Sequence, residues 1–128
     1  MRWTVLIVDD HPLVGQALEL SIRAAYVHLD VARVLRATEA EEFARVGGAR
    51  VKLVMLDLML PDATGFDALL RLQQRLPHAA FAMVSSRTDP HSVAMARAFA
   101  AKAYLSKAVP VEHLVNAVGA VLRGERVY

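Results

Sequence analysis

The stretch Val51-Lys-Leu-Val-Met-Leu-Asp57 decides the fold, because it is apolar almost throughout and ends in an aspartate. A second run of this kind, Val5-Leu-Ile-Val8, ends in the acidic pair Asp9-Asp10. Short, continuous apolar runs are typical of strands covered on both faces, as in parallel sheets. Carboxylates that follow such strands place negative charge at one edge of the sheet, where burial is costly unless a cation joins them. The two runs therefore predict a buried sheet with a cation-binding edge.

Apolar runs and helical patterns alternate five times along the chain of 128 residues. The apolar runs predict strands at residues 4–8, 29–35, 52–56, 79–84 and 103–105. The predicted helices between them have recognisable start signals, which are Pro12, a capping box of Thr38 and Glu41, a cap at Asp62 or Thr64, the pair Asp89-Pro90, and Pro110. The fourth helix is rich in alanine and is expected to continue through Ala101.

Five strand–helix repeats in so short a chain predict an α/β fold, a doubly wound five-stranded parallel sheet between two layers of helices. We expect one domain over residues 1–128, with the flavodoxin-like strand order 2-1-3-4-5 of a three-layer sandwich. In such a sheet the site lies at the carboxyl ends of the strands, where the strand order reverses. Strands one and three are then neighbours, so Asp9, Asp10 and Asp57 are expected to meet there.

Composition narrows the class of protein. The chain is 55% hydrophobic and 22% charged, which is typical of a globular domain. It has no cysteine, so disulfides and thiolate metal sites are excluded. The net charge of +2 comes from scattered basic residues, so we expect no direct nucleic-acid binding by this segment. Charged residues interrupt every apolar run and no signal-peptide pattern opens the chain, so we expect a cytoplasmic protein that does not enter a membrane.

Five polar side chains come directly after the predicted strands: Asp9, Asp10, Asp57, Ser85 and Lys107. Each has an ordinary interpretation, because aspartate commonly caps helices and turns, and serine and lysine are common on surfaces. Two adjacent carboxylates repel each other without a counter-cation, however, and a set of oxygen ligands favours Mg²⁺ or a similar hard ion. A carboxylate can also attack phosphorus while a bound metal holds the phosphoryl oxygens. The pattern therefore favours Asp57 as a phosphoryl acceptor.

Four blocks carry a resemblance to a known family. They are Val8-Asp-Asp-His-Pro12, Leu56-Asp-Leu-Met-Leu-Pro61, Met83-Val-Ser-Ser86 and Tyr104-Leu-Ser-Lys107. In this order and at this spacing they resemble the signature blocks of response-regulator receiver domains, which have the CheY-like fold. Each block is weak alone, but together they are specific, and they span essentially the whole chain.

The resemblance implies a two-component signalling pathway. Asp57 would accept a phosphoryl group from a phosphohistidine of a sensor histidine kinase. Asp10, Asp57 and the main-chain carbonyl of Met59 would bind Mg²⁺ or Mn²⁺, and Asp9 would assist through a water molecule. The chain would then be a signalling domain and not an enzyme, although it would support its own metal-dependent aspartyl phosphorylation and dephosphorylation.

The resemblance also implies a conformational switch. Ser85 and Lys107 would bind the phosphoryl oxygens, and the side chain of Tyr104 would turn inward. The surface formed by the fourth helix, the fifth strand and the fifth helix would then change its partners. In physical terms, the phosphoryl group would bias an element that already has two states.

Three positions depart from the common pattern or vary within it. Met59 is bulky and apolar at a position that lines the site in this family, and Arg87 follows Ser85 by two residues. Both are expected to tune the phosphoryl lifetime by changing access of water. Ala108 stands where many receivers have proline after the lysine, and a cis bond without proline would cost about 3–4 kcal/mol. The resemblance therefore leaves the loop after Lys107 undefined.

Two further segments indicate a subfamily. Asp9-Asp-His-Pro-Leu-Val14 and Leu122-Arg-Gly-Glu-Arg126 resemble receivers of the NarL/FixJ type, which usually precede a LuxR-type helix-turn-helix domain. The resemblance implies an output domain beyond Tyr128 that regulates transcription and binds DNA, although a stand-alone receiver that acts on a downstream protein stays open. A homodimer is also left open.

Other classes of protein share part of the pattern. A flavodoxin-like cofactor binder would have the same fold, but the pair Asp9-Asp10 would repel the phosphate that such a protein binds in its first loop. A metal-dependent phosphatase usually carries its nucleophile and its acid on the first strand. An unphosphorylated pseudo-receiver that serves as a docking module is the third alternative, and the presence of all five site residues argues against it.

Overall fold

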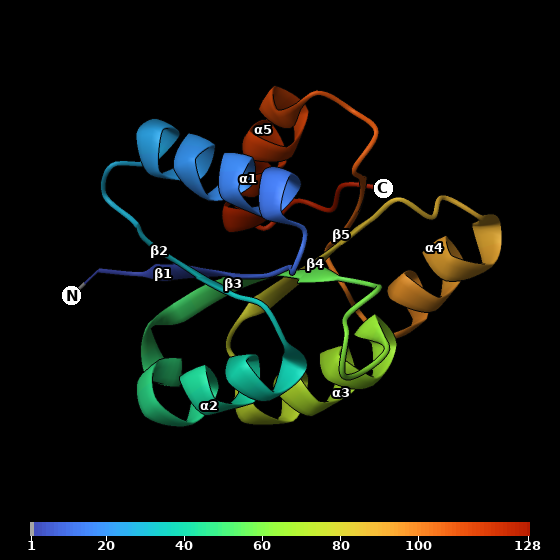
Figure 1. Cartoon of the computed structure of the whole chain (residues 1–128), viewed down its shortest axis with the longest axis horizontal. Coiled ribbons are helices and arrows are strands. Elements are labelled where there is room, and N and C mark those ends of the chain that lie inside the picture. The colour runs from blue at the N-terminus through green and yellow to red at the C-terminus, as the bar shows by residue number, and fades with distance from the viewer. Residues whose placement is uncertain (1) are drawn as a thin grey trace.

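The computed structural model describes residues 2–128, in which strands and helices alternate along the chain (Figure 1). The strands are β1 (Thr4–Val8), β2 (Asp30–Val34), β3 (Val51–Asp57), β4 (Ala80–Ser85) and β5 (Ala103–Ser106). The helices are α1 (Pro12–Ala25), α2 (Ala37–Gly47), α3 (Gly65–Arg75), α4 (Pro90–Ala98) and α5 (Val111–Leu122), with a short 3-10 turn η1 (Gly48–Arg50) before β3.

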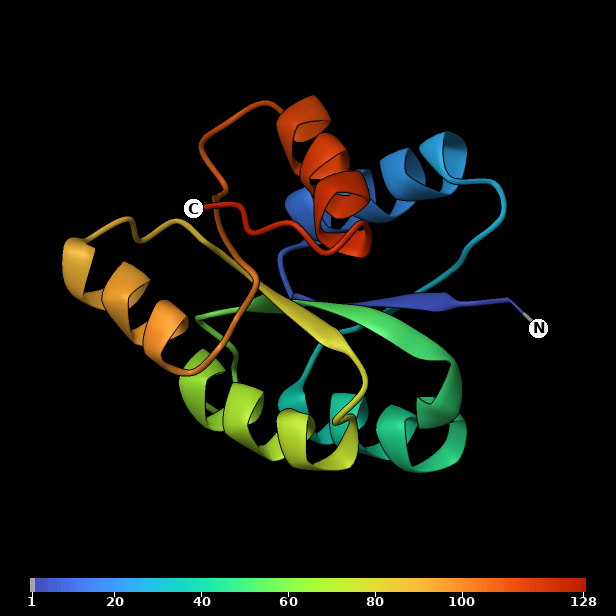
Figure 2. The ribbon, with the colours of Figure 1, turned by 180° about the vertical axis from the view of Figure 1, so that it is seen from behind.

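The strands form one parallel sheet in the order β2-β1-β3-β4-β5. Helices α1 and α5 cover one face, and α2, α3 and α4 lie on the other (Figures 1 and 2). The predicted fold class and strand order are therefore confirmed. No helix within residues 2–128 is long and apolar enough to span a membrane.

Each central strand contributes side chains to two hydrophobic cores, one on each side of the sheet. In β1, Val5 and Ile7 pack on the side of α1 and α5, whereas Leu6 and Val8 pack on the side of α2 and α3. All four side chains are almost fully buried, which explains why the apolar run is continuous instead of alternating. Polar residues can appear only where the strand ends, and this places Asp9 at the edge of the sheet.

The predicted capping box of Thr38 and Glu41 is wrong. Helix α2 begins at Ala37, and the carboxylate of Asp62 accepts hydrogen bonds from the amides of Ala37 (2.9 Å) and Thr38 (3.0 Å). Asp62 is one of the two caps expected for α3, but that helix is capped by the other, Thr64. A side chain that satisfies two of the free amides at a helix start can replace a local cap.

Helix α4 ends at Ala98, earlier than the predicted continuation through Ala101. Ala100 has a φ of 63°, the left-handed conformation in which a helix commonly ends. The chain then reverses so that the amide of Lys102 donates to the carbonyl of Phe81 (2.7 Å) at the start of β5. Alanine carries no stop signal, so the sequence did not indicate this turn. The peptide bond between Lys107 and Ala108 is trans, as are all others within residues 2–128.

The C-terminal segment, residues 125–128, lies along the outer edge of β5, as the position of the C-terminus shows (Figure 2). The amide of Val127 donates to the carbonyl of Lys102 and its carbonyl accepts from the amide of Tyr104, both at 2.9 Å. The hydroxyl of Tyr128 donates to the carbonyl of Ala101, and the guanidinium of Arg97 lies 4.0 Å from its ring centroid. This segment therefore pairs with the outer edge of the sheet through one parallel bridge between Ala103 and Val127.

Candidate functional site

Asp57 is the last residue of β3, and a tight contact fixes the loop that follows it. The amide of Gly65 donates to the carbonyl of Leu58 at 2.8 Å. A Cβ atom at Gly65 would lie 2.4 Å from Leu58 Cα and 2.7 Å from the Asp57 carbonyl oxygen, which are backbone atoms that cannot move aside cheaply. Only glycine allows α3 to begin this close to β3, so Gly65 helps to position Asp57.

Asp9, Asp10 and His11 form the short connection between β1 and α1. The buried Asp9 accepts a hydrogen bond on Oδ1 from the amide of His11 (2.8 Å). Pro12 then opens α1 at its first position, as expected from the sequence. Asp10 points outward and its side chain is 40% exposed, which makes it the accessible member of the acidic pair.

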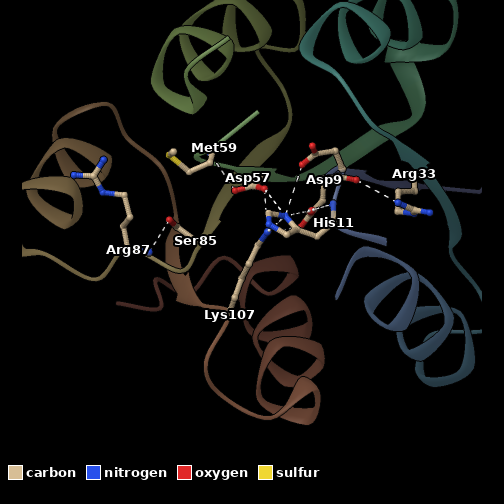
Figure 3. Close-up of polar contacts among 9 residues, drawn as sticks. Asp9, His11, Arg33, Asp57, Met59, Ser85, Arg87 and Lys107 are labelled. Atoms are coloured by element: carbon tan, nitrogen blue, oxygen red, sulfur yellow. Dashed lines mark hydrogen bonds and ion pairs between the residues drawn. The ribbon is translucent and has the colours of Figure 1, made fainter. Parts of the chain in front are cut away.

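Lys107 crosses from the loop after β5 and joins the two buried carboxylates (Figure 3). Its Nζ lies 2.9 Å from Asp9 Oδ2 and 2.9 Å from Asp57 Oδ2, and its side chain is only 7% exposed. The Nζ also lies 2.8 Å from His11 Nδ1. In this dry setting the ammonium is the counter-ion that keeps two buried carboxylates in the folded chain.

Four groups offer ligand atoms to a cation: Asp9, Asp10, His11 and Asp57. One carboxylate oxygen from each aspartate and one imidazole nitrogen all lie within 4.8 Å of one another. Three carboxylates face a single ammonium, so with a neutral imidazole the cluster has a surplus of two negative charges. The charge and the oxygen-rich set fit one divalent cation such as Mg²⁺.

The predicted oxygen-binding and switch residues lie beside this cluster. Ser85 ends β4 and is fully buried, and its Oγ accepts a hydrogen bond from the amide of Arg87 (3.0 Å). The hydroxyl of Tyr104 donates to the carbonyl of the same Arg87, and its side chain is buried. The carbonyl of Ser85 also accepts from the amide of Lys107 (3.0 Å). One residue of the β4–α4 loop, Arg87, therefore connects Ser85 with Tyr104.

Met59 and Arg87 line the same cleft next to the site, together with Thr64, Phe66 and His91. The amide of Met59 donates to Asp57 Oδ1 at 3.0 Å, so the Met59 backbone lies against the aspartate while its side chain is 54% exposed. The Arg87 guanidinium is exposed and lies 3.6 Å from Asp89 Oδ1. Both residues thus line a cleft that begins at Leu58, the residue after Asp57, and Figure 3 shows Met59 nearer to Asp57 than Arg87 is.

Sequence reasoning missed two residues of the site. His11 lies in the centre of the cluster, although it stood in the sequence only as one letter of a motif. Arg33, on β2, donates from Nη1 to the main-chain carbonyl of Asp9 (3.2 Å) and is held by Glu19. An imidazole directly after two carboxylates was a signal for His11, whereas nothing in the sequence pointed to Arg33.

Comparisons with known proteins agree with this geometry. A family model described as the response regulator receiver domain matches residues 5–119. A glycerol metabolism activator of Pseudomonas putida is 25% identical over 124 residues, which cover 95% of this chain and 55% of the relative. The DNA-binding transcriptional activator DevR/DosR of Mycobacterium tuberculosis is 32% identical over 114 residues, which cover 89% of this chain and 52% of the relative. The chain thus spans about half the length of these two curated relatives.

A solved structure is also similar over the whole chain. It is a two-component response regulator of the LuxR family from Aurantimonas sp. SI85-9A1, with a TM-score of 0.88 and 26% sequence identity, and the match covers 100% of this chain and 90% of that one. The family model and the structural match include every strand that contributes to the site. On these grounds, the chain belongs to the response regulator receiver domain family of two-component signalling proteins.

Proposed function

We propose that Asp57 accepts a phosphoryl group from the phosphohistidine of a sensor histidine kinase, and that the phosphorylated chain controls an output function. The observation that carries the proposal is the contact of one ammonium, that of Lys107, with two buried carboxylates. A stable core has no need for this arrangement, because a buried ion pair rarely stabilises more than an apolar pair of similar size. Buried charge at the end of parallel strands favours a chemical role.

Asp57 is oriented for attack by two contacts. The amide of Met59 holds Oδ1 and the ammonium of Lys107 holds Oδ2, so the carboxylate has a fixed plane. In the transfer, a bond forms between a carboxylate oxygen and phosphorus while the bond from phosphorus to the histidine nitrogen breaks, and the nitrogen leaves with the electron pair. Lys107 then lies next to the phosphoryl oxygens and stabilises their charge.

Asp10, Asp57 and the main-chain carbonyl of Met59 would hold Mg²⁺ or Mn²⁺, and Asp9 would assist through a water molecule. When bound, the ion neutralises and orients the phosphoryl oxygens. The exposure of Asp10 supports a direct role for its carboxylate. The engagement of Asp9 by Lys107 and by the amide of His11 supports an indirect role for Asp9.

Ser85 and Tyr104 would carry the signal away from the site. A phosphoryl oxygen would attract the Ser85 hydroxyl, which now accepts from the amide of Arg87. The hydroxyl of Tyr104 donates to the carbonyl of the same residue. A shift of the β4–α4 loop would therefore move Tyr104 and change the surface of α4, β5 and α5. Met59 and Arg87 would tune the phosphoryl lifetime, and their place in the cleft next to Leu58, the residue after Asp57, supports this role.

A second domain would read this surface. This chain covers only about half the length of the glycerol metabolism activator and of the transcriptional activator DevR/DosR, which supports an output domain of the LuxR type in the full-length protein. DNA binding would then belong to the output domain, and this chain would be a single receiver domain in the cytoplasm. A stand-alone receiver that acts on a downstream protein is the alternative.

Phosphorylation can be tested by intact-mass measurement after incubation with Mg²⁺ and acetyl phosphate. We expect one labile phosphoryl adduct on the native chain and none on Asp57→Asn. The matched control is Asp67→Asn, because Asp67 is an exposed aspartate at the start of α3. An adduct on Asp57→Asn would mean that another residue accepts the phosphoryl group. The absence of any adduct on the native chain would support a pseudo-receiver.

The lifetime roles can be tested on the same adduct. Met59→Asn and Arg87→Ala should each change the rate of adduct loss by at least about threefold, because each alters the access of water to the acyl phosphate. Decay rates equal to that of the native chain would remove these two residues from the proposal.

A further inference from the structure

We infer that His11 is a nitrogen ligand of the metal site, so that the site binds a first-row transition ion through an imidazole as well as through carboxylates. The inference rests on the proposed metal site, but it adds a ligand and changes the class of ion that the site prefers. His11 belongs to the loop between β1 and α1, and Figure 3 shows its ring between Asp9, Asp57 and Lys107.

The ring nitrogen lies close to three carboxylates at once. His11 Nδ1 is 3.0 Å from Asp9 Oδ1, 3.3 Å from Asp57 Oδ2 and 3.6 Å from Asp10 Oδ1. Ligands about 2.1 Å from a six-coordinate ion are separated from their neighbours by about 3 Å. The nitrogen is therefore spaced from the carboxylate oxygens as a ligand in the same coordination shell would be.

The contact with Lys107 places Nδ1 beside the cation that the cluster already holds. In the ring tautomer without a proton on Nδ1, this atom accepts from Lys107 Nζ at 2.8 Å, because an ammonium can only donate. The electron pair of Nδ1 then points into the group of carboxylates. Electron pairs of oxygen and nitrogen that converge in this way need a cation among them; the Lys107 ammonium is that cation here, and a divalent ion would take the same role.

The backbone holds His11 in this position. Its amide donates to Asp9 Oδ1 at 2.8 Å, and Pro12 fixes the start of α1 immediately after it. The ring is half exposed, so a hydrated ion can reach Nδ1 from solvent. An arrangement imposed by two neighbouring residues needs little reorganisation when the ion arrives.

Three carboxylates together with one imidazole should favour metal ions that bind nitrogen well. Carboxylates suit Mg²⁺ and Mn²⁺, whereas imidazole adds affinity for Ni²⁺, Co²⁺ and Zn²⁺. All sites bind Ni²⁺ more tightly than Mn²⁺, so a preference for Ni²⁺ by itself says nothing about His11. The specific consequence is that removal of the imidazole weakens Ni²⁺ binding far more than Mg²⁺ binding.

The test is calorimetric titration of the untagged chain with Mg²⁺ and with Ni²⁺. In His11→Ala, the dissociation constant for Ni²⁺ should rise at least about tenfold, because loss of a residue that only hydrogen-bonds to a metal ligand already weakens metal binding by about that factor. The dissociation constant for Mg²⁺ should change less than about threefold. His113→Ala is the matched control, since His113 is exposed on α5, and it should leave both constants unchanged. Equal loss of affinity for both ions in His11→Ala would overturn the inference.

A spectroscopic measurement identifies the ligand directly. Pulsed electron paramagnetic resonance of the Mn²⁺-loaded chain should detect coupling to one ¹⁴N nucleus, and the coupling should disappear in His11→Ala and persist in His113→Ala. Absence of nitrogen coupling in the native chain would refute the role of His11. If Asp57 still forms its adduct with Mg²⁺, only the His11 inference fails, whereas loss of the adduct in the native chain would contradict the proposed function itself.

Discussion

Strand β5 contributes to two regions that are held together by different forces. At its carboxyl end, Lys107 joins the buried carboxylates of Asp9 and Asp57. Along its outer edge, Val127 pairs through the backbone and Tyr128 packs under Arg97. The first region depends on the charge of one side chain, whereas the second distributes small contacts over several atoms. Removal of one group should therefore cost much more in the first region than in the second.

Replacement of Lys107 by methionine should have the largest effect on stability. In metal-free buffer, Lys107→Met should lower the free energy of unfolding by about 3 kcal/mol, because Asp9 and Asp57 would stay buried without their cation. Urea unfolding followed by circular dichroism measures this difference. Lys52→Met removes an ammonium that lies 5.1 Å from the centroid of the Trp3 ring and should cost less than about 1 kcal/mol. Similar costs for the two variants would mean that the contacts of Lys107 with Asp9 and Asp57 stabilise the fold no more than an ammonium at the surface does.

Replacement of Val127 by proline should have an intermediate effect. Val127→Pro removes the amide that donates to Lys102 and leaves the carbonyl of Lys102, just before β5, without this donor, so we expect a loss of about 1–2 kcal/mol in urea unfolding. Val127→Thr keeps both the amide and the β-branched shape, and it should stay within about 0.5 kcal/mol of the native chain. If the proline variant is as stable as the native chain, the C-terminal segment does not stabilise the edge of β5.

Replacement of Asp62 by alanine should have the smallest effect, and this effect should depend on pH. Burial works to raise the pKa of Asp62, but the amides of Ala37 and Thr38 that donate to it bring its pKa below the ordinary value of 3.8. The stabilisation is therefore present above that value and is lost as pH falls through the lower folded-state pKa. At pH 7, Asp62→Ala should cost about 1 kcal/mol, as loss of a helix cap does.

The pH dependence of this difference provides the check. The gap between Asp62→Ala and the native chain should shrink progressively as urea unfolding is repeated at pH values further below 3.8, where the carboxyl group binds a proton first in the unfolded and then in the folded state. A gap that keeps its size at low pH would mean that the charge of Asp62 does not contribute to the cap.

Much of the fold follows from the sequence because strands covered on both faces leave a strong signal. The predicted strand at residues 52–56 corresponds to Val51–Asp57, and the sheet order is the one expected. The predicted cap of α2 was wrong because the residue that caps this helix is distant in the sequence. Asp62 caps a helix that begins 25 positions earlier in the chain, so no local pattern near Thr38 could reveal it.

In the candidate site, too, some residues could be predicted from the sequence and others could not. Motif spacing was sufficient to bring Asp9, Asp57 and Lys107 together, because each lies at the end of a strand or directly after it. The orientation of His11 and the reach of Arg33 depend on side-chain geometry that a motif does not encode. The pairing of the C-terminal segment was equally hidden, since a single bridging residue gives no periodic pattern.

The backbone pairing of the C-terminal segment with β5 also bears on contacts between copies of the protein at high concentration. An open strand edge can pair with the same edge of another molecule and begin aggregation. Val127 covers this edge at β5 with the chain's own backbone. At the opposite edge, β2 carries Asp30 and Arg33, charged residues of the kind that discourage such pairing. Both edges of the sheet therefore carry features that discourage pairing of strands between copies of the chain.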